Sequence, residues 1–235
     1  MRLLVTRPEP ENARTANVLR AHGHHVTIAP MLRIEIIAGA DFGPPPWTAV
    51  LVSSANGIRA IAAHRRHAEL TALPILTVGR ASADTARTYG FTDVISADGD
   101  VRDLARLASE RLAGARAPLL YVAGEDLSGN LAGALSAQGF AIQTVVAYRA
   151  IKATRLPVEA EAALSAARVD GVLHFSRRST ESYLECGGGA PALAPVHYCI
   201  SARAAEPLKA AGAARIEIAV RPDEESLLAL VMPKP

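Results

Sequence analysis

The chain has 235 residues, of which 25 are basic and 23 acidic, giving a net charge of +2 with neutral histidines. Hydrophobic residues make up 50% and charged residues 20% of the sequence, a composition that builds a folded core and excludes a disordered chain. Only 4% of the residues are aromatic, so the stacking platforms that hold single-stranded nucleic acid are scarce. Together with the near-neutral charge, this predicts no nucleic-acid partner.

The cysteines and the apolar segments indicate the environment of the protein. Cys186 and Cys199 form no Cys-x-x-Cys motif and no cluster with histidines at metal-ligand spacing, so we expect neither a disulfide nor a metal site. The first residues lack the apolar region of a signal peptide, and no stretch approaches the roughly 20 apolar residues of a membrane-spanning helix. We therefore expect a cytoplasmic protein without a membrane partner.

Short apolar runs recur along the chain, and each is followed by a turn and a helical pattern. They lie at residues 3–6, 49–53, 75–78, 119–123, 172–175, 196–200 and 216–220. A strand followed by a helix, repeated, predicts an α/β fold with parallel sheets. Because the runs are apolar at successive positions, we expect helices to cover both faces of each sheet.

The sequence also resembles itself. A shift of 122 places residues 50–54 on 172–176, and it places 76–90 on 198–212, with the strand, the helix start and the closing glycine in step. Consistent order and spacing over several units indicate a duplicated architecture.

The remaining unit, at 119–142, has its counterpart at the front of the chain, because a shift of 116 places residues 3–26 on it. This circular relation predicts two similar domains. One is continuous over about 41–145, and the other is assembled from about 1–30 plus 155–235.

The chain must then cross between the domains twice, at about 31–40 and 146–154. Both segments contain a short alternating stretch, so we predict that they form a two-stranded antiparallel hinge. We also expect a cleft between the two domains.

The turns after the predicted strands hold the candidate binding residues, because ligands of open parallel sheets gather at the carboxyl ends of the strands. These candidates are Thr6, Arg7, Pro8, Ser53, Ser54, Ala55, Asn56, Gly79, Arg80, Ser82, Gly124, Glu125, Ser128, Ser176, Arg177, Arg178, Ser179, Ser201 and Arg203. Hydroxyl and amide side chains also cap helices without any ligand, and this interpretation stays open for each turn. The arginines oppose the helix dipole, so their recurrence favours a ligand with several dispersed negative charges.

The chain contains no P-loop, dinucleotide fingerprint, zinc-protease motif or nucleophile elbow. Tyr148 lies in the predicted crossing strand beside the expected cleft, where a phenol can donate a proton to a departing oxygen. The alternative is that Tyr148 only packs against the hinge.

Five short motifs, taken in order, resemble the uroporphyrinogen-III synthase family over essentially the whole chain. They are Val-Thr-Arg-Pro at 5–8, Val-Ser-Ser-Ala-Asn-Gly at 52–57, Thr-Val-Gly at 77–79, Ala-Tyr-Arg at 147–149 and Phe-Ser at 175–176. The chain departs from the family at two turns. Residues 200–204 lack the family's Gly followed by Thr or Ser, and residues 124–128 lack an Arg that is common in relatives.

The resemblance implies two flavodoxin-like, doubly wound parallel-sheet domains joined by a β-ladder, with no metal and no organic cofactor. It implies a lyase that cyclises hydroxymethylbilane to uroporphyrinogen III, with inversion of ring D and loss of water. This linear tetrapyrrole carries an acetate and a propionate on every ring, which suits a site edged by amides and arginines. Tyr148 matches the family's hinge tyrosine, which assists hydroxide departure. We expect a monomer that receives its substrate from hydroxymethylbilane synthase.

Three other functions remain open from the sequence. The main alternative is a non-catalytic, hinge-type binding module for a polyanionic small ligand. A degenerate synthase that keeps the fold without turnover is the second, and a duplicated phosphoryl-receiver pair is the third, although the acidic cluster of receivers is missing.

Overall fold

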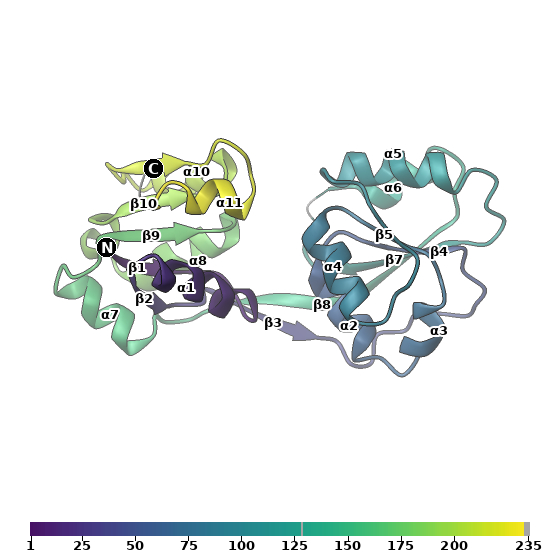
Figure 1. The fold of residues 1–235 in the computed structure, drawn as a ribbon, viewed down its shortest axis with the longest axis horizontal. Coiled ribbons are helices and arrows are strands. Elements are labelled where there is room, and N and C mark those ends of the chain that lie inside the picture. The colour runs from purple at the N-terminus through teal and green to yellow at the C-terminus, as the bar shows by residue number, and fades with distance from the viewer. Residues whose placement is uncertain (128, 233–235) are drawn as a thin grey trace. The chain divides into compact units, whose positions relative to one another are not determined.

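The computed structural model describes residues 1–127 and 129–232, and the chain divides into two compact units (Figure 1). Unit 1 consists of Met1–Arg33 and Ile151–Pro235, and unit 2 consists of Ile34–Ala150. Both divisions lie inside the segments 31–40 and 146–154, at which the sequence predicts that the chain crosses between domains.

Unit 1 is built on a parallel sheet with the strand order β11-β10-β9-β1-β2. Its strands are β1 (Arg2–Val5), β2 (His25–Ile28), β9 (Gly171–His174), β10 (Val196–Cys199) and β11 (Ile216–Ile218). Its helices are α1 (Glu11–Ala21), α7 (Val158–Ser165), α8 (Arg177–Gly187), α9 (Ala190–Leu193), α10 (Ala202–Ala210) and α11 (Glu224–Leu228).

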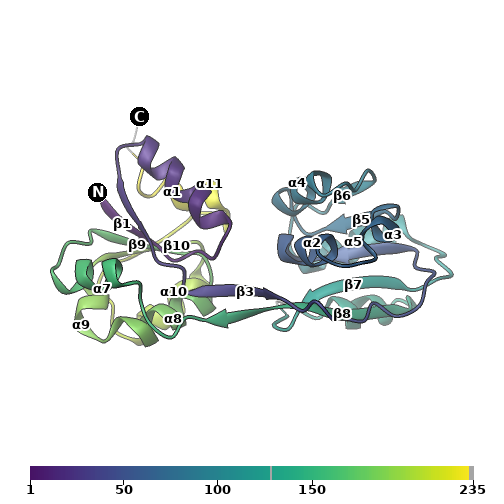
Figure 2. The same cartoon turned by 90° about the horizontal axis from the view of Figure 1, so that it is seen from below.

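Helices cover both faces of this sheet (Figures 1 and 2). Leu3 and Val5 of β1 pack on one face with Leu19 of α1 and Leu227 of α11. Leu4, which lies between them in the sequence, packs on the other face with residues of α7, α8 and α9. Successive strand residues point to opposite faces, so a strand that is buried on both faces needs an uninterrupted apolar run.

Unit 2 has a sheet in the order β3-β8-β7-β4-β5-β6, in which β8, β7, β4, β5 and β6 pair in parallel. The strands are β3 (Leu32–Ile36), β4 (Ala49–Val52), β5 (Ile75–Thr77), β6 (Val94–Ser96), β7 (Leu119–Gly124) and β8 (Ile142–Lys152). The helices are α2 (Ala55–Ala62), α3 (His67–Thr71), α4 (Arg80–Thr88), α5 (Val101–Arg111) and α6 (Leu131–Ser136).

The core of unit 2 is also divided between the two faces of its sheet. Val50 and Val52 of β4 pack with Ile58 and Ile61 of α2, and α3 and α4 complete this layer. Leu51, on the opposite face, packs with residues of α5 and α6. β4 is therefore apolar at every position because helices cover both faces of the sheet, as the sequence predicts.

The crossing segments contain β3 and the end of β8, and these two strands are neighbours in the sheet order. The Ala153 N–H donates to the Met31 carbonyl at 3.0 Å, and the Ile37 N–H donates to the Ala147 carbonyl at 2.9 Å. Residue numbers thus rise along one segment as they fall along the other, which is the pattern of an antiparallel pair.

The strand orders agree with the circular relation that the sequence shifts predict. The counterparts of β6, β5, β4, β7 and β8 are β11, β10, β9, β1 and β2, and these two series occupy their sheets in the same spatial order. Counted along the chain, unit 1 has the order 2-1-3-4-5 of flavodoxin-like sheets, whereas the parallel strands of unit 2 have the order 3-2-1-4-5. The circular relation accounts for this difference, because the same arrangement is entered at a different strand.

Glycines end the equivalent helices of the two units in the same manner. Gly90 follows α4 with a φ of 92°, and its counterpart Gly212 follows α10 with a φ of 82°. Only glycine adopts this left-handed conformation without steric cost, so the repeated Gly marks where each helix turns back toward the next strand.

Candidate functional site

Hydroxyl groups from neighbouring strands of unit 2 lie toward the carboxyl end of its sheet. Ser53 and Ser54 follow β4, Tyr121 lies in β7 and Tyr148 lies in β8. The Ser53 Oγ is 3.1 Å from the Oη of Tyr121, and the Tyr148 phenol lies near the Ser54 side chain, which acts to lower the pKa of the phenol. We call these four residues the hydroxyl cluster. β7 pairs with both β4 and β8, and Tyr121 and Tyr148 pack against opposite faces of the sheet, so the cluster consists of two pairs, Ser53 with Tyr121 and Ser54 with Tyr148.

The Tyr148 ring lies directly against the backbone of Gly124, the last residue of β7. A Cβ at Gly124 would lie 2.7 Å from Cε2 of the ring, so only a glycine leaves room for the tyrosine in this position. Burial raises the pKa of Tyr148, while the nearby Ser54 side chain and Gly124 backbone act in the opposite direction. The phenol therefore stays protonated at neutral pH and holds a proton that it can donate.

Ser54 has a second contact, at the start of α2. Its Oγ accepts a hydrogen bond from the Asn56 N–H at 3.2 Å, and Ala55 is the first residue of the helix. The Asn56 side chain in turn accepts a hydrogen bond from Arg59 at 2.7 Å. The capping interpretation is thus correct for Ser54, whose side chain also lies near the candidate acid Tyr148 and acts to lower its pKa.

The turn after β7 supports the same tyrosine. The Glu125 N–H donates to the Tyr148 carbonyl at 2.9 Å, and the Glu125 side chain is exposed. Ser128, which the sequence also places among the candidates, lies outside the described residues.

The turn after β5 is more open. Gly79 is the N-cap of α4 and provides no side-chain cap, and Ser82 in the first helical turn is half-buried. The Arg80 side chain is 84% exposed and pairs with Asp98 at 3.2 Å. The candidate residues of this turn are therefore accessible, but the charge of Arg80 is already balanced by a carboxylate.

In unit 1, the turn after β1 places Thr6 and Arg7 in different environments. Thr6 is fully buried and donates its hydroxyl hydrogen to the Leu173 carbonyl at 2.7 Å, so its side chain joins β1 to β9 and does not face a ligand. Arg7 pairs with Glu224 at 2.8 Å and lies over the Phe175 ring, 5.0 Å from its centroid. Pro8 is half-buried, and its carbonyl accepts a hydrogen bond at the start of α1.

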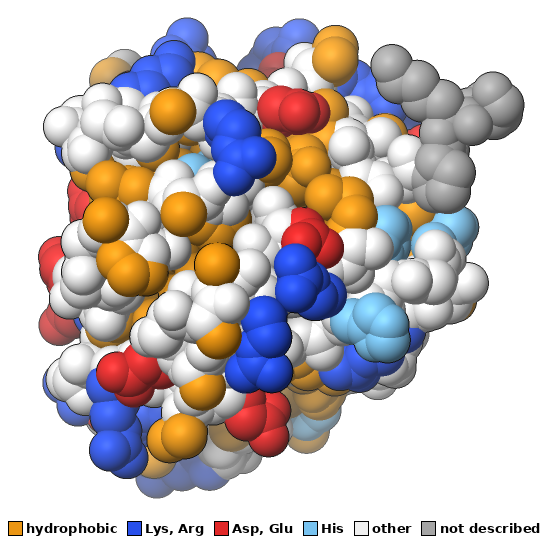
Figure 3. All heavy atoms as spheres, turned by 90° about the vertical axis from the view of Figure 1, so that its left-hand side faces the viewer, with side chains coloured by type: hydrophobic (Ala, Val, Ile, Leu, Met, Phe, Trp, Pro, Cys, Tyr) orange, Lys and Arg blue, Asp and Glu red, His pale blue; other side chains and the backbone are white. Residues whose placement is uncertain are grey.

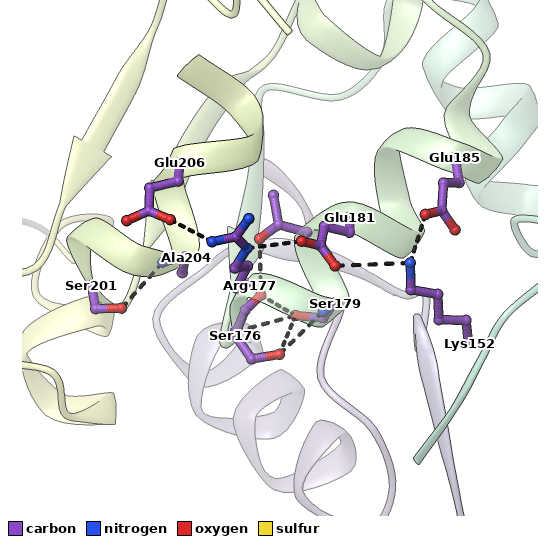
Figure 4. A network of polar contacts seen from close by, with 10 residues as sticks. Lys152, Ser176, Arg177, Ser179, Glu181, Glu185, Ser201, Ala204 and Glu206 are labelled. Carbon is purple, nitrogen blue, oxygen red and sulfur yellow. Dashed lines mark hydrogen bonds and ion pairs between the residues drawn. The ribbon is translucent and has the colours of Figure 1, made fainter. Parts of the chain in front are cut away.

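Figure 4 shows the turn after β9, where Ser176 and Ser179 form a reciprocal capping box at the start of α8. The Ser179 N–H donates to the Ser176 Oγ at 3.1 Å, and the Ser176 N–H donates to the Ser179 Oγ at 3.2 Å. Arg177 pairs with Glu181 at 2.8 Å and with Glu206 of α10 at 2.7 Å. Arg177 thus joins the two helices, and its side chain is still 49% exposed.

The turn after β10 is the one that departs from the family pattern. The Ser201 Oγ accepts a hydrogen bond from the Ala204 N–H at 3.3 Å and so caps α10 (Figure 4). Arg203 is exposed, and Arg178 of the preceding turn is half-buried. Arg7, Arg80 and Arg177 form ion pairs, whereas Arg203 forms none with the described part of the chain.

The sequence interpretation missed Tyr121 and the acidic partners of the arginines. Tyr121 sits inside an apolar strand run and therefore looks like a core residue. Glu224, the partner of Arg7, is more than 200 residues away along the chain, and no local pattern connects them. The repeat is the one sequence signal that could have indicated the Arg7–Glu224 pair. It places β1 beside β9, and hence Arg7 near the C-terminal part of its domain.

Two histidines of unit 1 are fully buried side by side. His174 ends β9 and His197 lies in β10, and their ring nitrogens Nε2 and Nδ1 are 3.1 Å apart. Burial lowers the pKa of His197 to about 4, and it lowers the pKa of His174 well below the usual value. Both rings are neutral at neutral pH, in agreement with a core role for His174.

Positive and negative side chains are interspersed on the face of the molecule shown in Figure 3, the pattern of a solvated surface. Within residues 1–127 and 129–232, no group of three or more His, Cys, Asp or Glu side chains is placed to hold a metal ion. None of the helices in these two ranges has the length and apolar character needed to span a bilayer.

The architecture of two α/β units with open parallel sheets is that of known structures. The chain is similar to the crystal structure of uroporphyrinogen-III synthetase from Helicobacter pylori, with a TM-score of 0.69 and 15% identity over 98% of each chain. It is also similar to a mutant uroporphyrinogen III synthase from the extremely thermophilic bacterium Thermus thermophilus. The TM-score is 0.57, with 17% identity over 98% of this chain and 97% of that one. At these identities the likeness establishes the fold.

The family follows from the sequence. The model of the family described as uroporphyrinogen-III synthase HemD matches residues 13–229 of the 235. No curated protein sequence matches the chain significantly. The chain therefore belongs to the uroporphyrinogen-III synthase family, and the resemblance drawn from its five short motifs is confirmed.

Proposed function

We propose that the chain performs the reaction of its family, the closure of hydroxymethylbilane to uroporphyrinogen III with inversion of ring D and loss of water. The observation that carries this proposal is the family match over residues 13–229. The hydroxyl cluster supports it, because a protonated phenol held beside a serine side chain is suited to assist the departure of hydroxide. The non-catalytic binding module is not favoured, since its main argument was the two-lobed fold that the synthase family shares.

Tyr148 supplies the proton in this account. As the hydroxide leaves the methylene of ring A, the Tyr148 hydroxyl donates its hydrogen to it, and water is released. The electrons come from the pyrrole nitrogen, so the resulting azafulvene needs no redox partner. The substituted carbon of ring D attacks it, and the spiro intermediate fragments and recloses at the free carbon of ring D. That carbon then loses a proton, which returns to the phenolate, so that one water is lost overall.

The protein's main contribution is orientation, because the pyrroles themselves provide the driving force for hydroxide loss. An enzyme of this kind must hold ring D so that its substituted carbon meets the methylene, a proximity effect worth several orders of magnitude in rate. Because Gly124 has no side chain, the Tyr148 ring lies directly against its backbone, and the nearby Ser54 side chain orients the hydroxyl. The acid is thereby preorganised before the substrate arrives.

We propose that the candidate residues of the strand-end turns, apart from the buried Thr6, bind the acetate and propionate groups. Arg177 uses its Nε–H for Glu181 and one Nη1–H for Glu206, so three of its five N–H groups remain for a substrate carboxylate. Arg203 is exposed and needs no such sharing. Dispersed donors of this kind suit a ligand whose charges are distributed around a ring, and they leave the chemistry to the hydroxyl cluster.

The finer features of the function are also part of this proposal. They are a cofactor-independent lyase reaction, flexing of the paired segments of β3 and β8 as a hinge, a monomeric chain, a cytoplasmic location, and direct receipt of hydroxymethylbilane from its synthase. Cofactor independence is supported by the chemistry, since the elimination and the ring closure leave the oxidation level unchanged.

The test is turnover of freshly generated hydroxymethylbilane by protein that has been dialysed against a chelator. The products are oxidised to uroporphyrins, and the type I and type III isomers are separated by chromatography. We expect type III to form without any added metal or coenzyme. Type I alone from folded protein would refute the proposed function, and type III only after a metal is restored would refute cofactor independence.

A further inference from the structure

Tyr121 is the buried member of the hydroxyl cluster. Its side chain is 1% exposed, and its ring packs among the apolar residues that α5 and α6 cover. A buried phenol requires a hydrogen-bond partner, and the Oγ of Ser53 provides one at 3.1 Å. The other fully buried tyrosine, Tyr183, meets the same requirement with a backbone carbonyl, that of Ala192 at 2.9 Å.

The identity of the partner gives Tyr121 a role that Tyr183 does not have. A carbonyl is fixed by the backbone, whereas a serine hydroxyl rotates until a partner fixes it. Ser53 is half-buried at the carboxyl end of β4 and directly precedes Ser54, which contacts Tyr148. Tyr121 itself is too deeply buried to touch a ligand, so any influence on a ligand must pass through Ser53.

We infer that Tyr121 is a positioning residue, which donates its hydroxyl hydrogen to Ser53 and so directs the Ser53 hydrogen toward a carboxylate of the substrate. A chain of hydroxyls that ends on an anion is polarised along its length, so each bond strengthens the next. This inference rests on the proposed function, because the carboxylate belongs to the linear tetrapyrrole. It specifies how Ser53 makes the carboxylate contact proposed for the strand-end turns, and it adds Tyr121 behind it, a residue that the family motifs do not contain.

The inference predicts which kinetic parameter changes. The hydrogen-bonded pair Tyr121–Ser53 binds a carboxylate that is present both in the bound substrate and in the transition state. Losing this hydrogen bond therefore weakens the binding of both equally. Tyr121→Phe should raise KM about three- to tenfold and leave kcat within about twofold, as expected for one hydrogen bond to a charged group. Ser53→Ala should show the same split, and the double variant should be no worse than Ser53→Ala alone.

The matched control is Tyr183→Phe, which also removes one buried tyrosine hydroxyl but whose partner is the backbone. It should leave KM and kcat at the wild-type values. Thermal unfolding of every variant separates a loss of structure from a loss of binding. If Tyr121→Phe does not fold, Ser53→Ala provides the test, because Ser53 is only half-buried. A wild-type KM for folded Tyr121→Phe, or effects of the two substitutions that multiply in the double variant, would overturn the inference.

Binding of uroporphyrin III, a stable octacarboxylate, provides a readout that does not depend on turnover. Affinities are measured by fluorescence quenching for the wild type, Tyr121→Phe and Tyr183→Phe. Weaker binding by Tyr121→Phe alone supports the inference even if the wild type fails to make the type III isomer. Equal affinities in all three proteins, together with normal type III synthesis, would reject the inference while leaving the proposed function intact.

Discussion

The close approach of Gly124 to Tyr148 gives the sharpest test of the proposed acid. Gly124→Ala adds a Cβ at 2.7 Å from Cε2, 2.8 Å from Cζ and 3.0 Å from Oη of Tyr148. Ordinary contacts of a Cβ begin at 3.4 Å, so the ring must move by about 0.7 Å and its hydroxyl is displaced with it. A displacement of about 1 Å at a reacting group can cost a hundredfold in rate, so we expect kcat to fall about ten- to a hundredfold. The extra methyl should also destabilise the fold by about 1–3 kcal/mol.

The assay is the initial rate of type III formation at saturating hydroxymethylbilane, with thermal unfolding measured on the same samples. Gly39→Ala is the control, because a Cβ at Gly39 meets no heavy atom within 4 Å. If the loss acts through the tyrosine, adding Gly124→Ala to Tyr148→Phe should reduce kcat no further. A folded Gly124→Ala protein with wild-type kcat, or a further loss in the double variant, would refute this reasoning.

Three further predictions follow from the charges and the hydroxyls. Tyr148→Phe should lower kcat about a hundredfold with KM within threefold in steady-state assays, and an unchanged kcat would remove the phenol from the mechanism. Arg177→Ala should weaken uroporphyrin III binding about three- to tenfold by calorimetry, whereas Arg87→Ala, another exposed and ion-paired arginine, should bind normally. Because His197 stays neutral in the folded protein down to about pH 4, its unfolded form alone takes up protons below its usual pKa of 6.5. Stability should therefore fall between pH 6.5 and 4, by about 2 kcal/mol at pH 5 from His197 alone. His174 adds to this effect, and urea unfolding that gives equal stability at pH 7 and pH 5 would contradict both assignments.

Most of the fold could be predicted because its information is periodic. The shift that places residues 50–54 on 172–176 also places β6 on β11, and of these two strands only β11 lies in one of the apolar runs. β6 has no fully buried residue, so its run carries a weaker hydrophobic signal than β4 or β7. Repeated order compensates for weak local signals, since a short strand is recognised by the place of its counterpart.

The candidate site was less predictable because its contacts join distant parts of the chain. A turn that contains an arginine looks like an open anion site until its carboxylate is found, and Glu224, the partner of Arg7, comes from the far end of the sequence. Tyr121 presents the opposite difficulty, because an apolar run hides the one hydroxyl within it that contacts the strand-end turn. Strand order predicts which turns are neighbours, but only side-chain packing decides which groups face each other.

The isomer composition of the product, measured as the amount of protein is increased, tests the central claim most directly. Hydroxymethylbilane closes spontaneously to the type I isomer, so the type III fraction reports how much of the substrate this chain has directed. We predict that the type III fraction rises with protein concentration toward a large majority, and that Tyr148→Phe shifts this rise to about hundredfold higher concentration. A product that stays type I at every concentration of folded protein would contradict the account.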